Sequence, residues 1–365
     1  MIRRVLLVAA LAAGCAKGAA GDNDAERTVA DPGFETGAVA VDSLLDEREV
    51  RLANLRQLTF GGQNAEAYFS PDDERLIFQA TPRDGTCDQQ YVMNVDGSDL
   101  RLVSTGFGRT TCGYFVPGAD RIVYSSTHLS DDACPAEPDF SQGYVWAIYP
   151  SYDVFSANPD GSDLTRLTAE DAYDAEATLS RDGEWIVFTS TRDGDLDIYK
   201  MRADGSEVTR LTHGVGYDGG SFFSYDGTKI VYRAHHPQTE QEIADYRRLL
   251  ADDLIRPSAL DIWIMDADGS NKRRLTDNGA ANFGPYFFPD GERVIFSSNM
   301  DDPAGREFDL YAIDVDGENL ERLTYAGDFD GFPMFNSDGS QLVFASNRGN
   351  ELPRETNLFL ADWVD

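Results

Sequence analysis

The sequence predicts an all-β fold, a six-bladed β-propeller of four-stranded antiparallel blades that an N-terminal strand closes. Three observations predict it. A turn and a β-branched strand recur six times, and the aromatic residue that ends each strand stands at position 78, 124, 188, 232, 296 or 344. An Asp-Gly turn recurs between these units. The last unit lacks its fourth strand, and a matching strand precedes the first unit. Units of about 45 residues with four short strands are typical of propeller blades.

Each unit opens with a turn of the Ser-x-Asp-Gly type and a short apolar strand, as in residues 180–188. The closing aromatic residues are separated by 46, 64, 44, 64 and 48 residues, so the second and fourth units are longer than the others. The additional residues fall at 128–152 and 235–259. We therefore expect a loop insert in blade 2 and another in blade 4.

A second turn contains Asp-Gly, for example at residues 204–205. The Asp-x-Asp-Gly pattern resembles part of a calcium loop, but such a loop needs a frame of about 12 residues that ends in an acidic residue. The turn recurs in register with the strands, and glycine readily adopts the positive φ of a tight hairpin. We interpret it as a hairpin between strands.

The last unit ends at Asp365 without a fourth strand. Residues 52–59 supply the missing strand, because their Arg-Gln-Leu-Thr ending matches the Arg-Leu-Thr of the other fourth strands, as at 210–212. An open sheet has two edges that pair readily with other chains. We expect the N-terminal strand to complete the last blade and to give one closed domain over residues 50–365.

The N-terminus resembles the export signal of bacterial lipoproteins. Arg3 and Arg4 precede an apolar run at 5–13 that is too short for a permanent membrane span, and Leu-Ala-Ala-Gly-Cys at 11–15 resembles a lipobox. We expect a signal peptide over residues 1–14, lipidation of Cys15, and a flexible tether over residues 15–49 with one helical turn near Leu44. The resemblance implies export and an anchor in the bacterial outer membrane, on its periplasmic side or at the cell surface.

The formal net charge of −33, from 64 acidic and 31 basic residues, excludes some partners. A surface of this charge repels nucleic-acid phosphates and anionic lipid head groups. We expect no nucleic-acid binding, contact with the membrane only through the Cys15 anchor, and a monomer.

The Ser-x-Asp-Gly-x-x-Ile-Val-Phe units, the Asp-Gly hairpins and the Arg-Leu-Thr strands resemble the WD-type repeats of TolB-like six-bladed propellers, over roughly residues 50–365. The resemblance implies a module that binds protein partners in the cell envelope. Where TolB carries an α/β domain, this chain has only the short tether, and no Gly-x-Ser-x-Gly elbow of a hydrolase is present. We expect a binding or scaffold module that is not an enzyme, and whose partner is an envelope protein, a peptide or a glycan.

A metal-assisted, carbohydrate-active enzyme is the alternative, since related propellers are oligogalacturonate lyases that hold a metal with histidines. The candidate ligands are the only four histidines, which are scattered over blades 2 to 4. The two that are adjacent in sequence point to opposite faces of a strand and would rarely share one metal ion. This favours the binding module. The histidines are His128, His213, His235 and His236.

Propeller topology sorts the connections onto two faces. The loops between the second and third strands and between blades share the loop face, while the Ser-x-Asp-Gly and Asp-Gly turns share the turn face. The loop face holds all four histidines, both inserts and three cysteines (Cys87, Cys112 and Cys134). An exported chain favours disulfides between nearby thiols, provided that their Cα atoms lie within about 7 Å. Cys87–Cys112 is the first choice because Cys112 begins a strand next to blade 1. Both other pairings stay open.

The two inserts carry the most distinctive loop sequences. The blade 2 insert contains Tyr144, Trp146, Tyr149 and Tyr152, which predict either an aromatic groove for a glycan or peptide or packing of the insert on its own blade. In the blade 4 insert, a capping box at 239–242 begins a helix whose apolar stripe predicts packing on the propeller or a partner-facing surface. Pro257 ends that segment.

The innermost strands should line a central channel. Six residues before each turn stand Asn64, Thr110, Asp174, Asp218, Asn282 and Asp330, and four residues before it stand Glu66, Cys112, Glu176, Gly220, Gly284 and Phe332. Capping of the backbone by Asx side chains explains the first set. The second interpretation is a divalent cation at the channel mouth, held by Asp174, Glu176 and Asp218 near His213. Glu66 and Glu176 break the sixfold pattern, and crowded carboxylates repel each other unless a cation or Arg109 compensates.

Overall fold

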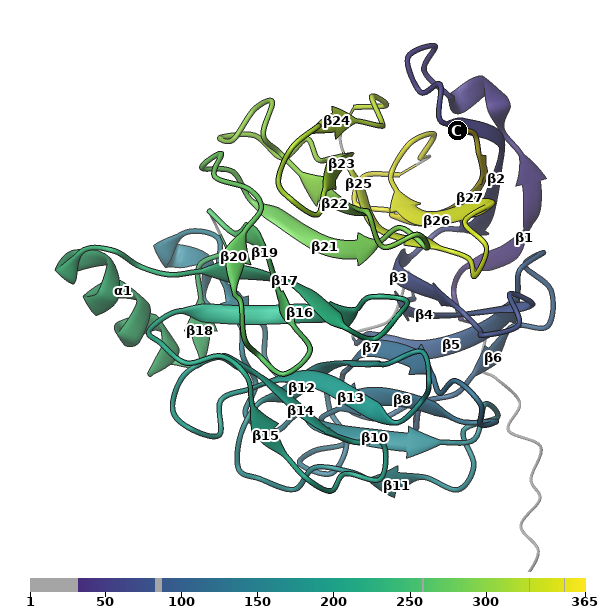
Figure 1. Cartoon of the computed structure of the whole chain (residues 1–365). Helices are drawn as coiled ribbons and strands as arrows, with labels where there is room; N and C mark the ends of the chain where they lie inside the picture. Colours follow the sequence, from purple (N-terminus) through teal and green to yellow (C-terminus); the bar gives the residue numbers. More distant parts are fainter. Residues whose placement is uncertain (1–31, 83–86, 258, 328, 351) are drawn as a thin grey trace, which may run out of the picture. The chain divides into compact units, whose positions relative to one another are not determined.

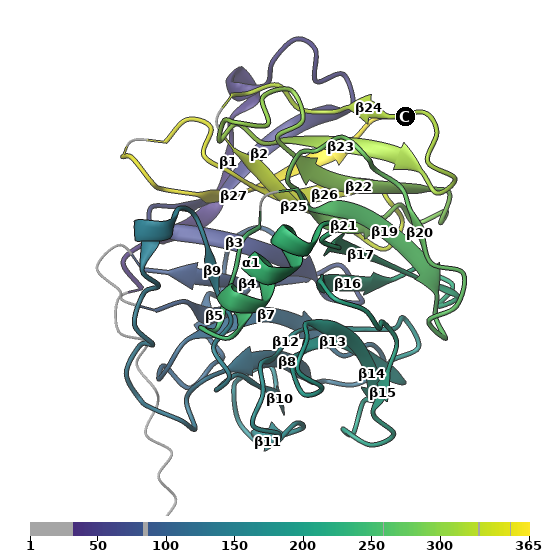
Figure 2. The same ribbon diagram turned by 90° about the vertical axis from the view of Figure 1, so that its left-hand side faces the viewer.

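The computed structural model describes residues 32–82, 87–257, 259–327, 329–350 and 352–365. In this part of the chain six antiparallel sheets surround a central axis, and each sheet is one blade (Figure 1 and Figure 2). The predicted six-bladed propeller is confirmed. Blade 1 contains β3 (Gln63–Phe69), β4 (Arg75–Thr81), β5 (Gln89–Asn94) and β6 (Arg101–Leu102). Blade 2 contains β7 (Thr110–Phe115), β8 (Ile122–Ser126), β10 (Asp153–Ala157) and β11 (Thr165–Arg166). Blade 3 contains β12 (Asp174–Leu179), β13 (Trp185–Ser190), β14 (Asp197–Arg202) and β15 (Thr209–Arg210).

The second half of the ring repeats this order. Blade 4 contains β16 (Tyr217–Phe223), β17 (Lys229–His235), β19 (Asp261–Asp266) and β20 (Arg273–Arg274). Blade 5 contains β21 (Asn282–Phe287), β22 (Arg293–Ser298), β23 (Asp309–Asp314) and β24 (Glu321–Arg322). Blade 6 contains β25 (Asp330–Phe335), β26 (Gln341–Ser346), β27 (Asn357–Trp363) and the N-terminal strands β2 (Leu52–Phe60) and β1 (Glu35–Ala40).

The recurring aromatic residues form the core between blades. All six of them, at 78, 124, 188, 232, 296 and 344, are fully buried. Neighbouring blades cover both faces of each second strand, which explains why these strands are apolar almost throughout. Burial of one such aromatic side chain stabilises the fold by roughly 1.5–3 kcal/mol.

The Arg-Leu-Thr motif ties the fourth strand of a blade to the start of its third strand. In blade 3, Arg210 Nη2 lies 2.5 Å from the Asp197 carboxylate, and Thr212 Oγ1 accepts a hydrogen bond of 2.9 Å from the N–H of Ile198. In blade 6 the N-terminal strand takes this role, since Thr59 Oγ1 accepts a bond of 2.8 Å from Leu358 N. β2 pairs with β27 from Leu52↔Trp363 to Gln57↔Phe359, so the predicted ring closure is confirmed.

The expected tether over residues 15–49 is wrong from Phe34 onward, because this part of the chain packs on the propeller. Phe34 is 6% exposed and contacts Phe78 and Tyr91, with ring centroids 6.1 and 5.4 Å apart. β1 pairs with β2, and the buried Glu49 carboxylate contacts Arg348 at 3.1 Å. The expected helical turn is present as the 3-10 helix η1 (Asp42–Leu44). The signal peptide and Cys15 lie outside the described residues.

The two inserts meet over the loop face. The blade 4 insert forms α1 (Glu240–Leu250) and β18 (Leu254–Ile255), and the blade 2 insert forms η2 (Phe140–Gln142) and β9 (Trp146–Ala147). β18 and β9 pair with each other, so the inserts bridge blades 2 and 4; α1 and β9 are in front of the ring in Figure 2. The capping box is confirmed, and α1 packs on the propeller as expected, since the buried Tyr246 hydroxyl donates to Gly216 O at 2.7 Å. We call this pair of inserts the cap. Among the described residues, no helix is long and apolar enough to cross a membrane.

Candidate functional site

Side chains from the innermost strands fill the middle of the channel. They come from the position two residues before each Ser-x-Asp-Gly turn. Tyr68 contacts Tyr114 and Phe222, with ring centroids 5.5 and 5.6 Å apart, and Phe222 contacts Tyr286 at 5.3 Å. These rings separate the two ends of the channel.

Closer to the loop face, every innermost strand bends at a β-bulge. The ladder register shifts at this point in all six blades. A bulge changes the direction of a side chain. As a result, the three polar bulge residues Glu66, Cys112 and Glu176 line one cavity of the channel. The bulge residues have φ between 51° and 59°: Glu66, Cys112, Glu176, Gly220, Gly284 and Phe332.

An ion pair between Glu176 and Arg233 lies at the centre of this cavity. Glu176 also accepts hydrogen bonds from Thr189 Oγ1 at 2.7 Å and from Gly220 N at 2.9 Å. Arg233 is 8% exposed, donates from Nε to the Tyr217 hydroxyl at 2.8 Å, and lies 5.2 Å from the Trp146 ring in the cap. A buried charge is tolerated when it is paired and fully hydrogen-bonded. The cap therefore contacts the polar centre of the channel directly.

Two glycines provide the room for this ion pair. A Cβ at Gly220 would lie 2.4 Å from Arg233 Nη1, and a Cβ at Gly219 would lie 2.6 Å from Glu176 Oε2. Gly220 also has φ of +59°, which a side chain would disfavour. Blade 4 thus replaces the side chains of its innermost strand with an arginine from β17.

Glu66 and Cys112 form the less satisfied part of the cavity. Burial is the main reason that the pKa of Glu66 rises to about 7, against a hydrogen bond with Cys112 and the charge of Arg233. Glu66 Oε2 has no hydrogen-bond partner among the described residues. Burial and the nearby Glu66 carboxylate hold the pKa of Cys112 well above its usual value, so this cysteine is a thiol. The free space beside these groups suits about one water molecule.

Replacing Glu66 with Gln should raise the melting temperature at pH 8 by about 4 °C and change it little near pH 4.5. The pKa of this carboxyl is raised by folding, so its unfavourable ionisation begins above 4.5 and is complete above about 7. At pH 8 the ionised Glu66 lowers the free energy of unfolding by about 2 kcal/mol, a value reduced for solvent screening because the side chain is partly exposed. Thermal melts at the two pH values measure this difference. The exposed control Glu74→Gln should shift neither melt, and equal stabilisation by Glu66→Gln at both pH values would contradict the assignment.

The outer set of channel residues caps the backbone in two blades and contacts basic side chains in three. Asn64 and Asn282 donate from Nδ2 to carbonyl oxygens, at 2.8 Å to Gly61 and 2.7 Å to Leu260, as expected of Asx capping. The three aspartates instead contact a basic residue of their own blade. The pairs are Arg192–Asp174 at 2.9 Å, His236–Asp218 at 3.0 Å and Arg348–Asp330 at 2.7 Å.

These pairs correct the cation interpretation of the channel mouth. The protein's own basic side chains compensate Asp174, Glu176 and Asp218, and His213 is exposed on the loop between blades 3 and 4. Arg109 pairs with Asp88 and Glu137 rather than with the channel carboxylates. Within the described ranges, no three His, Cys, Asp or Glu side chains are placed to hold a metal ion together.

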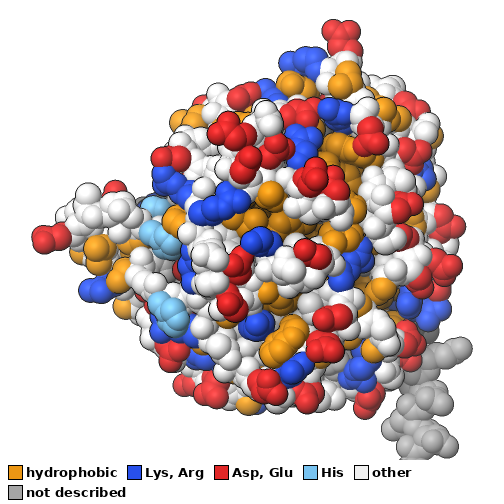
Figure 3. Space-filling view, in the orientation of Figure 1, with side chains coloured by type: hydrophobic (Ala, Val, Ile, Leu, Met, Phe, Trp, Pro, Cys, Tyr) orange, Lys and Arg blue, Asp and Glu red, His pale blue; other side chains and the backbone are white. Residues whose placement is uncertain are grey.

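The other histidines serve local contacts. His128 packs on Phe155 with ring centroids 4.5 Å apart, and burial lowers its pKa. His235 Nδ1 lies 2.9 Å from Ala259 O. Burial acts to lower the pKa of His236, but its hydrogen bond to Asp218 and the negative charges of Asp218, Asp195 and Asp197 together raise it. In Figure 3 the pale-blue histidine side chains that are visible form two separate patches on the side of the molecule that carries α1.

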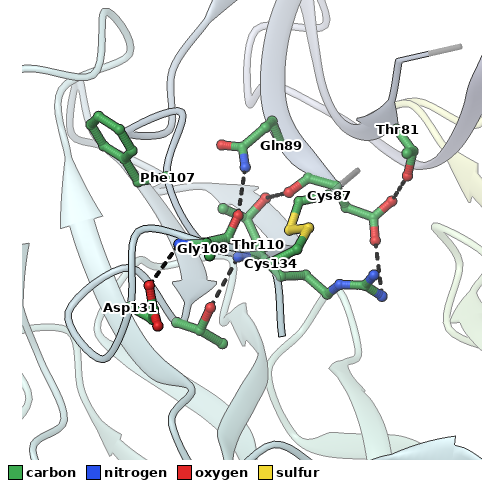
Figure 4. The surroundings of a disulfide bond; sticks show 12 residues. Thr81, Cys87, Gln89, Phe107, Gly108, Thr110, Asp131 and Cys134 are labelled. Carbon is green, nitrogen blue, oxygen red and sulfur yellow. Dashed lines mark hydrogen bonds and ion pairs between the residues drawn. A yellow bond between two sulfur atoms is a disulfide. The ribbon is translucent and has the colours of Figure 1, made fainter. Parts of the chain in front are cut away.

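The disulfide joins Cys87 to Cys134, with Cα atoms 5.7 Å apart (Figure 4). Cys112 is free and buried. The first choice, Cys87–Cys112, is therefore wrong. The bulge places Cys112 beside Glu66 in the channel, away from the loop that carries Cys87. The bond that forms links the β4–β5 loop of blade 1 to the blade 2 insert.

Polar contacts reinforce this link. Gln89 Nε2 donates to Gly108 O at 2.9 Å, and Arg109 N donates to Thr127 Oγ1 at 2.9 Å. The Arg109 guanidinium lies 2.7 Å from Glu137 of the insert and 3.7 Å from Asp88. Three loops are thus held together at the rim of blade 2.

The aromatic side chains of the blade 2 insert mainly pack inward. Tyr152 is buried, Trp146 lies over Arg233, and the Tyr149 hydroxyl donates to Ala136 O at 2.8 Å. Of the four, only Tyr144 is exposed, so they do not form the expected aromatic groove. Instead, four exposed apolar side chains come from the loops of blade 2: Phe107 at 53%, Leu129 at 57%, Phe140 at 51% and Tyr144 at 62%. We call these four residues the blade 2 patch.

Arg233 and Phe107 are the main site residues that sequence reasoning missed. Arg233 had a signal, because the residue after the closing aromatic is uncharged in the other five units: Gln79, Ser125, Thr189, Ser297 and Ala345. The Gly219-Gly220 pair on the neighbouring strand was a second signal. Phe107 had none, since a single apolar residue in a loop forms no pattern.

Comparisons with known proteins support the fold. A structure from Agrobacterium tumefaciens assigned as TolB is 19% identical, with a TM-score of 0.57, and the match covers 91% of this chain and 98% of that one. TolB from Acinetobacter baumannii is 16% identical, with a TM-score of 0.53, over 83% of this chain and 64% of that one. An oligogalacturonate lyase in complex with manganese is 12% identical, with a TM-score of 0.52, over 91% and 97%.

These identities show that the fold is shared. The family is shown by the sequence itself, since residues 149–252 and 247–353 match the TolB beta propeller domain. Together the two matched segments cover more than half of the chain. This chain therefore belongs to the TolB β-propeller domain family.

Proposed function

We propose that this chain is an exported, lipid-anchored binding module of the cell envelope that holds a protein partner on its loop face, at the blade 2 patch. One observation carries the proposal. All three exposed aromatic residues among the described residues, Phe107, Phe140 and Tyr144, belong to the loops of blade 2. Exposed aromatic side chains on a rigid support are typical of protein interfaces.

The disulfide supports both the site and the compartment. Cys87–Cys134 and the Arg109 ion pairs hold the loops that carry the patch, which lowers the entropy lost when a partner binds. Disulfides persist in oxidising compartments outside the cytosol. This agrees with the lipobox at residues 11–15, from which we propose an anchor at Cys15 in the outer membrane.

A protein or peptide fits the patch better than a glycan. Leu129 contributes an aliphatic surface beside the aromatic rings, whereas sugars are bound by aromatic faces combined with convergent polar groups. The metal-assisted alternative gains no support from the geometry, because the four histidines are not brought together.

The proposal is tested by photo-cross-linking in the envelope. A p-benzoylphenylalanine at Phe107 or Tyr144 should give a discrete adduct with a protein partner, and one at Leu320 should not. Leu320 is 50% exposed and lies beside an Asp-Gly turn on the opposite face. Mass spectrometry of the same purified chain should find a diacylated Cys15 at its N-terminus.

Two double substitutions distinguish specific binding at the blade 2 patch from non-specific hydrophobic association. Phe107→Ser with Tyr144→Ser should reduce the adduct formed from position 140 at least fivefold. Val208→Ser with Leu320→Ser removes two exposed apolar side chains from the turn face and should leave that adduct unchanged. Equal adducts from position 320, or an adduct that survives the loop-face substitutions, would place the partner elsewhere.

A further inference from the structure

The cap closes the loop-face end of the cavity that holds Glu176 and Arg233. The ring of Trp146 in β9 has its centre 5.2 Å from the Arg233 guanidinium. Tyr152, at the end of the same insert, is buried, and its ring lies 5.7 Å from that of Tyr173 at the start of blade 3. At the other end, the aromatic rings in the middle of the channel close the cavity. Access to the cavity from the loop face therefore depends on the position of the cap.

The cap has an apolar attachment of its own on blades 3 and 4. Ile148, Tyr246 and Ile255 of the cap pack in a buried hydrophobic cluster that is separate from the main core of the propeller. The propeller contributes side chains such as Leu196 of blade 3 and Tyr217 of blade 4 to this cluster. Because the cluster is separate from the main core, it can rearrange without unfolding the blades.

Toward blade 1, the cap is attached in a different way. Residues 131–144 of the blade 2 insert are bonded covalently to the β4–β5 loop of blade 1 through Cys134 and Cys87. Other contacts of this segment are polar, such as the ion pair of 2.7 Å between Arg109 and the exposed Glu137. Exposed ion pairs contribute little to stability. The disulfide is therefore the strongest connection between this part of the cap and blade 1.

We propose that the cap is a lid over this cavity and that the Cys87–Cys134 disulfide is a redox-sensitive latch that holds the lid closed. When the bond is reduced, residues 131–144 lose their covalent link to blade 1, and the nearby Trp146 can move away from Arg233. The cap stays attached to blades 3 and 4 through its apolar cluster. The lid controls access to the channel and does not depend on a partner at the blade 2 patch.

An external dithiol is the class of reductant that opens the latch. Cys134 is half-buried and Cys87 is buried, so a thiolate of the reductant reaches the sulfur of Cys134 first. It forms a mixed disulfide with Cys134, and Cys87 leaves as a thiolate that takes up a proton. The second thiolate of the reductant then attacks the reductant's own sulfur in the mixed disulfide and releases Cys134. Two electrons thus pass to the protein, which gains two thiols, and the dithiol becomes a disulfide.

Cys112 reports on the lid, because it is a free thiol that lines the cavity and takes no part in the latch. The residue is only 8% exposed. With the lid closed, an alkylating reagent should therefore reach its sulfur slowly. With the lid open, the same reagent should reach it much faster, while the blades stay folded.

The test measures alkylation by N-ethylmaleimide in the folded full chain, with peptide mapping by mass spectrometry to follow each cysteine separately. Reduction with dithiothreitol, which is removed before labelling, should speed the alkylation of Cys112 at least tenfold. Cys87→Ser combined with Cys134→Ser should give the fast rate at Cys112 with and without the reductant. All rates are compared at the same pH, so that the reactivity of the thiol itself does not change.

A buried cysteine in the main core distinguishes the lid from a general loosening of the propeller. Ala312→Cys places a thiol at a fully buried position in β23 of blade 5, and its alkylation should stay slow before and after reduction. Hydrogen exchange of the β23 amides gives the same comparison without a substitution. An unchanged rate at Cys112 in a chain whose Cys87 and Cys134 become labelled would overturn the proposal. Equal acceleration at position 312, or fast alkylation of Cys112 in the oxidised chain, would overturn it as well.

Discussion

Deleting residues 16–60 should convert the protein into an aggregating species, whereas deleting residues 16–31 should leave its melting temperature nearly unchanged. The larger deletion removes β2, which pairs with β27 and closes blade 6. It exposes the edge of β27 and removes Thr59, which accepts the hydrogen bond of Leu358 N. A long apolar edge strand pairs readily with other chains.

An intermediate deletion separates ring closure from packing of the segment that precedes it. Deleting residues 16–46 keeps β2 but removes β1 and Phe34, whose ring packs between Phe78 and Tyr91. Losing a buried phenylalanine costs about 3 kcal/mol, so the melting temperature should fall by roughly 5 °C without aggregation. Thermal melts and size-exclusion chromatography of the three deletions measure both effects. Equal melting temperatures for the deletions that end at 46 and at 60 would refute closure by β2.

The fold could be predicted from the sequence because its repeats carry the same physical constraints six times. Each blade has a buried aromatic such as Phe188 and a hydroxyl in or after its fourth strand, such as that of Thr212 or Ser104, which accepts a hydrogen bond from the third strand. Such constraints produce a periodic sequence pattern. The same pattern, ending at Thr59, identifies the N-terminal strand that completes the last blade. Phe34 has no periodic neighbours, and for that reason its packing could not be predicted.

The candidate site was less predictable than the fold. Strand register shows which face of a strand a residue occupies, but it does not show which side chains pack against that face. The register of Cys112 places it with Glu66 and Glu176 in the channel, and this alone argues against its pairing with Cys87. Cys87 and Cys134 lie in loops, where no strand register indicates the position of a residue. Only the folded structure shows that these two cysteines meet. Similarly, Gly219, Gly220 and the charge of Arg233 signal an unusual place in blade 4, but they do not show that the guanidinium pairs with Glu176.

Replacing Arg233 with Met should reduce the free energy of unfolding at pH 8 by about 3 kcal/mol. The guanidinium is the cation that pairs with Glu176, and its removal leaves that carboxylate in a partly buried cavity with Glu66 beside it. The charge of Arg233 also lowers the pKa of Glu66, so its loss makes ionisation of Glu66 still less favourable. Removing one partner of a buried ion pair is usually far more damaging than removing both.

Two further variants distinguish an unpaired charge from lost packing. Arg233→Met combined with Glu176→Gln removes both charges and should recover at least half of the loss, because no uncompensated carboxylate remains at that position. Arg202→Met breaks ion pairs of 3.0 and 3.4 Å with Glu184 and Glu207 at the surface, and it should cost less than about 1 kcal/mol. Urea unfolding monitored by tryptophan fluorescence gives all three values, and it also reports on Trp146, whose ring lies over the guanidinium. If the single and double substitutions at the Arg233–Glu176 pair were equally destabilising, the unpaired charge would not be the cause. The guanidinium would then stabilise the protein through its contacts with Trp146 and Tyr217. In that case packing, and not charge, would stabilise the polar centre of the channel.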